Sequence, residues 1–192
     1  TVACYMVEGG GSRDFAATRA MAYADPALFD GLMDLLTDST IGYLSAQADA
    51  GAEALMLFDS WAGVLSPSLF RKHVIGPAKR IVEALKRRHP AVPIIGFPRL
   101  AGPMLGEYAA TGVNAVAIDT SVDPAKAAAS IPAHVALQGN LDPMALVAGG
   151  RAMLDEAASI LAATKGRPHI FNLGHGIVPH TPPEHVAALM EF

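Results

Sequence analysis

Five short apolar runs, each followed by polar residues and then by a helical stretch, constrain the fold of this chain more than any other feature. The runs cover residues 54–58, 93–97, 115–118, 135–137 and 170–171. Continuous apolar runs of this length are typical of parallel strands that are buried on both faces. Because strands that alternate with helices form a parallel sheet, the sequence predicts an α/β fold.

Two architectures place helices between parallel strands, the (β/α) barrel and the open doubly wound sheet. An open dinucleotide-binding sheet usually carries a G-x-G-x-x-G turn after its first strand. The only run of three glycines, residues 9–11, lacks that spacing. The pattern therefore favours the barrel and leaves the open sheet as the alternative. A complete barrel has eight strands, and only five clear ones are visible.

Helices are expected between the strands, and several have a recognisable start. Asp25, Asp123 and Asp142 each precede a proline, which suits the first turn of a helix, while the carboxylate can accept from free N–H groups. The helix that begins near residue 66 contains Pro77, which we expect to kink or split it.

The two ends of the sequence indicate a piece of a longer chain. Residues 1–7 are apolar and are expected to be the end of a strand already in progress, while residues 183–192 read as a helix that is cut off. No linker or composition shift divides the chain. We therefore expect one domain over residues 1–192, truncated at both ends.

Composition and motifs exclude several classes of function. The formal charge of −4 implies no general attraction to nucleic acid or to an anionic membrane. No apolar run approaches the ~20 residues of a membrane helix. Cys4 is the only cysteine, so an internal disulfide framework and a cysteine-rich metal site are excluded. Neither an H-E-x-x-H motif nor a P-loop is present, so we expect no metal and no nucleotide.

Candidate functional residues follow the predicted strands, where a barrel carries its chemistry. Asp59 and Ser60 follow the first clear strand, and Arg99 follows the second, where its guanidinium could grip a carboxylate. The alternative for Arg99 is an ion pair with Asp119. His175 lies between two glycines, which allow a ligand to approach closely, and it can be neutral or charged near pH 7.

Tyr5 is the candidate at the end of the first apolar segment. Its phenol can donate or accept a hydrogen bond, and glycines 9–11 follow it. Taken by itself, a tyrosine at such a position is more often structural than functional.

Read together, five segments of the chain resemble the uroporphyrinogen decarboxylase family. They occur in the family's order and at similar spacing, and the ordered set is far more specific than any one member. The segments are YMVEGGG at 5–11, LFDSWAG at 57–63, LQGNLDP at 137–143, FNLGHG at 171–176 and PPEH at 182–185.

The resemblance implies a (β/α)8 TIM barrel that here lacks its first two strands and most of the third. It implies decarboxylation of the four acetate side chains of uroporphyrinogen III to coproporphyrinogen III, without metal or organic cofactor, by a cytoplasmic homodimer. Tyr5, Ser60 and His175 match substrate-binding positions of the family, with Tyr5 and His175 as the catalytic candidates. Asp59 and Arg99 stand at less uniform substrate-binding positions.

The resemblance also implies that the chain alone is inactive, because the family's pyrrole-binding aspartate and its amino-terminal arginines precede Thr1. Two other functions remain open. One is a non-catalytic porphyrinogen-binding paralogue or inactive fragment. The other is a zinc-dependent corrinoid or coenzyme M methyltransferase, against which the single cysteine argues strongly.

Overall fold

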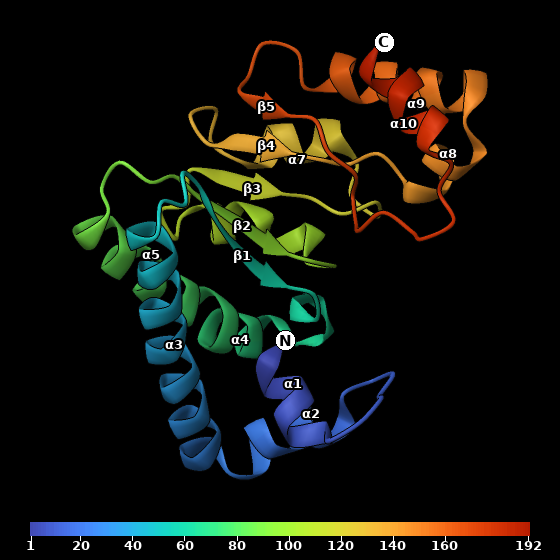
Figure 1. Ribbon diagram of the computed structural model, residues 1–192. Helices are drawn as coiled ribbons and strands as arrows, with labels where there is room; N and C mark the ends of the chain where they lie inside the picture. Colours follow the sequence, from blue (N-terminus) through green and yellow to red (C-terminus); the bar gives the residue numbers. More distant parts are fainter.

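A single parallel sheet of five strands forms the centre of the computed structural model, which describes residues 1–192. The strands lie side by side in chain order (Figure 1). An open doubly wound sheet would reverse its strand order part-way, so the unbroken order agrees with the predicted incomplete barrel. The strands are β1 (Leu55–Asp59), β2 (Ile94–Pro98), β3 (Ala115–Ala117), β4 (Ala136–Gln138) and β5 (His169–Ile170).

Helical segments connect the strands and precede β1. The α-helices are α1 (Val2–Glu8), α2 (Ala16–Ala24), α3 (Pro26–Asp49), α4 (Pro67–Phe70), α5 (Gly76–Arg88), α6 (Leu105–Ala109), α7 (Pro124–Ser130), α8 (Pro143–Ala148), α9 (Gly150–Ala163) and α10 (Pro183–Met190). Short 3₁₀ turns form η1 (Ala62–Val64) and η3 (Gly102–Met104), and a π-helical turn forms η2 (Arg71–Ile75).

The predicted helix starts are confirmed in detail. The carboxylates of Asp25, Asp123 and Asp142 accept from backbone N–H groups in the first turns of α3, α7 and α8. Pro77 lies in the first turn of α5, directly after the π-helical turn η2. The predicted helix therefore runs without a break from Pro67 to Arg88, and a π-helical turn stands where proline cannot continue the regular hydrogen-bond ladder.

The two faces of the sheet have different environments. Side chains on the helix-facing side are nearly inaccessible and pack in one core with α3, α5 and α6: Leu55, Ile94, Val116 and Leu137. Phe58 and Ile170, on the opposite face, are 65% and 43% exposed. In a closed barrel this second face points into the interior. The open edges of β1 and β5 and the exposed side chains between them are those of an incomplete barrel.

The prediction of a strand over residues 1–7 is wrong, because Val2–Glu8 form helix α1. β1 pairs only with β2, so no strand lies on its other side to satisfy the backbone of this segment. A helix satisfies those groups within the segment. It ends at Gly9, whose φ of 64° allows its N–H to reach the Tyr5 carbonyl, and it buries Ala3 and Cys4.

Helices α3 and α5 pack side by side along the sheet (Figure 1). Lys72 in η2 binds Asp30 at 2.9 Å, and Arg80 of α5 forms ion pairs with Asp34 and Asp38 of α3. These pairs are largely exposed, so they orient the helices more than they stabilise them. None of the helices combines the length and apolar character needed to cross a bilayer.

Buried His73 should make the stability of the fold depend on pH. Its Nδ1 lies 3.9 Å from Asp30 and its ring packs edge-on against Phe29, while its Nε2 has no hydrogen-bond partner. Burial, followed by the charge of Lys72, lowers the pKa of His73, although Asp30 opposes the shift. Below its ordinary pKa of about 6.5, the unfolded chain binds a proton that the folded chain resists.

The free energy of unfolding is therefore expected to fall as the pH drops below about 7, by at most about 1.4 kcal/mol per pH unit from this residue. The loss should end once the pH is below the folded-state pKa. Urea titrations at several pH values between about 5 and 8 would measure this loss of stability. His73→Phe should flatten this part of the profile, and an unchanged slope would contradict the assignment.

Candidate active site at the carboxyl edge of the sheet

The carboxyl ends of all five strands lie along one edge of the sheet, and a polar residue follows four of them closely (Figure 1). Ser60 follows β1, Arg99 follows β2, Asp119 follows β3 and Asn140 follows β4. The loop after β5 carries the exposed His175. Because the strands are parallel, these loops are neighbours in the order of the strands.

The loops after β1 and β2 are joined through their backbones. Arg99 donates its N–H to the Asp59 carbonyl at 3.1 Å, and Gly63 donates its N–H to the Arg99 carbonyl at 3.0 Å. A Cβ atom on Gly63 would collide with the Leu100 carbonyl, so only glycine permits this approach. The Arg99 guanidinium lies over the ring of Trp61, 5.8 Å from its centroid, and it forms no ion pair.

The carboxylate of Asp119 is buried and fully engaged by other donors. It accepts from the Leu100 N–H at 2.6 Å and from the N–H and hydroxyl of Ser121 at 2.9 and 2.5 Å. The alternative considered for Arg99, an ion pair with Asp119, is therefore not formed. The Arg99 guanidinium remains available to an anionic ligand.

The loops after β3, β4 and β5 are joined by Asn140. Its Nδ2 donates to the carbonyls of Asp119 and Val122, both at 2.8 Å. A Cβ atom on Gly174 would lie 2.6 Å from the Thr120 nitrogen and 3.1 Å from the Asn140 carbonyl oxygen. Gly174 thus allows the loop that carries His175 to pack directly against two neighbouring loops.

Asp59 faces helix α1. Its Oδ1 accepts from the Thr1 hydroxyl at 2.7 Å, and this hydroxyl accepts from the Trp61 backbone N–H at 3.3 Å. These contacts place the start of α1 at the carboxyl end of β1. The carboxylate is a poor direct partner for an acidic ligand because like charges repel.

Tyr5 lies on α1 and is 57% exposed, so it stands on a helix and not at the strand end that the sequence predicted. Ser60 is partly buried and forms no side-chain hydrogen bond within the chain. The structure therefore places Ser60, Arg99 and His175 in the loops after three strands, at one edge of the sheet, and Tyr5 on helix α1. No contact within the chain joins their side chains.

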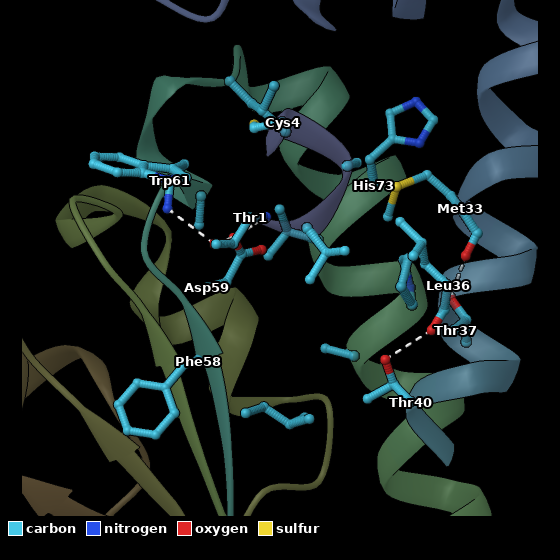
Figure 2. A pocket seen from close by; sticks show the side chains of 18 of the residues that line it. Thr1, Cys4, Met33, Leu36, Thr37, Thr40, Phe58, Asp59, Trp61 and His73 are labelled. Carbon is cyan, nitrogen blue, oxygen red and sulfur yellow. Dashed lines mark hydrogen bonds and ion pairs between the residues drawn. The ribbon is translucent and has the colours of Figure 1, made fainter. Parts of the chain in front are cut away.

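A cavity of about 160 Å³ lies on the helix-facing side of β1 (Figure 2). Figure 2 shows Thr1 beside Asp59, with Trp61 at one side and Met33 and Leu36 of α3 across the space. Its lining is mainly apolar, and of the five candidates only Asp59 takes part. The cavity is separate from Tyr5, Ser60, Arg99 and His175, and its lining does not suit a ligand with many carboxylates.

Comparison with known proteins decides the family. A family model described as uroporphyrinogen decarboxylase (URO-D) matches residues 1–192. The chain belongs to the uroporphyrinogen decarboxylase family. Relatives that carry this name include those of Granulibacter bethesdensis (64% identity), Gluconacetobacter diazotrophicus (61%) and Gluconobacter oxydans (59%). The matches cover 100%, 99% and 100% of this chain and 56%, 54% and 55% of the relatives.

The resemblance found in the sequence is therefore confirmed, and the chain spans about half the length of the curated relatives it matches. The five parallel strands with connecting helices are consistent with part of the TIM barrel of the uroporphyrinogen decarboxylase family.

Sequence reasoning gave Asp119 and Asn140 too small a role. Asp119 was considered only as a possible ion-pair partner of Arg99, and Asn140 only as one residue of the segment LQGNLDP. Both are polar residues that directly follow a buried apolar strand, and both are at least 94% buried. That position was the available signal, since a buried polar side chain needs hydrogen-bond partners and so connects segments of the chain.

Proposed function

We propose that the protein represented by this chain converts uroporphyrinogen III to coproporphyrinogen III by removing carbon dioxide from four acetate side chains. We further propose that it needs no metal or organic cofactor and acts as a cytoplasmic homodimer. The observation that carries the proposal is the match over the whole chain to relatives named uroporphyrinogen decarboxylase, at 52–64% identity. The polar residues along the sheet edge support it.

The chemistry asks little of the protein beyond binding and proton transfer. Protonation of a pyrrole carbon makes the ring an electron sink, so the bond to the carboxylate carbon breaks and its electron pair enters the ring. A proton then converts the exocyclic methylene carbon to a methyl group, and the ring carbon releases the first proton to restore the pyrrole, so one proton is consumed for each carbon dioxide released. The protein must supply an acid, donors for the carboxylates and a rigid platform.

The edge residues fit these tasks. Arg99, which has no ion-pair partner, can bind a carboxylate through two parallel hydrogen bonds, and the free hydroxyl of Ser60 can donate to a second carboxylate. The exposed imidazole of His175 can donate to a carboxylate or move a proton. Tyr5 offers a phenol from α1. Asp59 acts by holding α1 in place, since its carboxylate already accepts from Thr1.

The test joins this chain to the part of the Granulibacter bethesdensis relative that precedes its match. We call this protein the completed chimera. It should form coproporphyrinogen from uroporphyrinogen III, as followed by chromatography of the oxidised porphyrins. The 192-residue chain alone should form none, because the remaining strands and the residues they carry are absent.

The intact relative is the positive control for the completed chimera. Binding of uroporphyrinogen without product would contradict the proposal and favour a non-catalytic porphyrinogen-binding paralogue. A zinc assay of the same sample addresses the methyltransferase alternative. No three histidine, cysteine, aspartate or glutamate residues of the chain gather as metal ligands would.

A further inference from the structure

The backbone directly after Arg99 is held in a strained conformation. Leu100 has a φ of 62°, in the left-handed region that residues with a branched or bulky side chain rarely adopt. Its side chain is 42% exposed, so packing of that side chain does not hold the turn. Such strain persists only where the surroundings fix it, and it concentrates at functional sites.

Asp119 is the group that fixes this turn. Its Oδ2 accepts from the Leu100 N–H at 2.6 Å, while Oδ1 is held by the two donors of Ser121. The carboxylate is 97% buried with its residue, so water does not compete for this bond. A hydrogen bond to a buried, charged acceptor is among the stronger ones in proteins.

Asn140 connects Asp119 to the loop that carries His175. Its amide donates to the Asp119 carbonyl, and its own carbonyl oxygen lies beside Gly174, the residue before His175. The loops that carry Arg99 and His175 are therefore both packed against the same buried pair, Asp119 and Asn140. Neither Asp119 nor Asn140 is exposed enough to bind a large ligand directly.

We propose that Asp119 is a positioning residue for Arg99, which it holds through the Leu100 turn at a fixed place relative to His175. This inference rests on the proposed function, in which Arg99 binds a carboxylate of the substrate. In this inference Asp119 affects catalysis through the position of Arg99. It neither contacts the substrate nor acts only by stabilising the fold.

A double-mutant cycle in the completed chimera tests this relation. Asp119→Asn keeps the size of the side chain but removes the charge, and it should raise KM roughly tenfold with a smaller change in kcat. Arg99→Gln should raise KM by a similar factor. In the Arg99→Gln background, Asp119→Asn should add little, because the residue it positions is already gone. Equal effects of Asp119→Asn in both backgrounds would overturn the proposal.

A second readout does not depend on activity. Trp61 is the only tryptophan of the chain, and Arg99 lies over its ring. With any tryptophan of the relative's portion replaced by phenylalanine, Asp119→Asn and Arg99→Gln should change the Trp61 emission alike, and the double variant should match Arg99→Gln. If Arg99→Gln leaves KM unchanged but the emission cycle is non-additive, the substrate role of Arg99 fails while the positioning by Asp119 stands.

Two further variants keep the test decisive. Asp25→Asn makes the same chemical change at the start of α3, outside this network, and it should leave both KM and emission unchanged. If Asp119→Asn does not fold, Ser121→Ala replaces it, because it removes a hydroxyl that holds Asp119 Oδ1 while the carboxylate stays. It should raise KM severalfold only when Arg99 is present, and an equal rise without Arg99 would overturn the proposal.

Discussion

His175→Ala in the completed chimera is expected to lower kcat/KM for uroporphyrinogen III by about 10²-fold, the lower end of what a positioned proton donor contributes. The imidazole is exposed on the loop after β5, between two glycines that let a substrate approach. Gly174 allows this loop to pack against the loops after β3 and β4, so the backbone that carries the imidazole is held in place. Steady-state kinetics with product chromatography would measure the effect.

His180→Ala is the matched control for this substitution. His180 is exposed on the same loop, but it stands outside the segments that resemble the family. Its replacement should leave kcat/KM within about twofold, since it removes no group assigned to substrate. Unchanged turnover and unchanged substrate affinity in His175→Ala would remove His175 from the site.

The strands of the sheet could be predicted because each one is determined by a short run of neighbouring residues. Each apolar run ends where backbone pairing ends, so the five strands were located within about two residues and in the right order. The capping carboxylates of Asp25, Asp123 and Asp142 act on the next few residues of the chain and were equally readable. Residues 1–7 failed because an apolar run can be a strand or a helix, and the choice depends on whether a neighbouring strand is present.

The candidate site was predictable only in part. Ser60, Arg99 and His175 could be found because they follow strands, and the strand direction sends them to one edge. Their partners could not be found in the same way. The bond from Leu100 to Asp119 spans 19 positions and the bond from Asn140 to Asp119 spans 21, so each depends on how separate loops fold together. The sequence also could not show that Asp59 faces α1.

Arg167→Met is expected to lower the free energy of unfolding by about 3 kcal/mol, a large effect for a side chain that is not fully buried. Nη1 donates to the Ala128 carbonyl at 2.8 Å, and Nη2 donates to the Val135 carbonyl at 2.7 Å. Longer bonds reach the carbonyls of Ile131 and Pro132. One guanidinium thus binds several carbonyls of the connection between α7 and β4, and methionine would leave the Ala128 and Val135 carbonyls without this donor.

Arg151→Met is the control, because Arg151 pairs with Asp155 on the exposed surface of α9 and its replacement should leave the urea midpoint nearly unchanged. Urea titration of the completed chimera would measure both, and equal losses would contradict the role of Arg167. The connection held by Arg167 enters β4 at its amino end, opposite the edge with Arg99 and His175. Arg167→Met should therefore unfold at lower urea yet keep KM unchanged while folded, which separates support of the sheet from arrangement of the site.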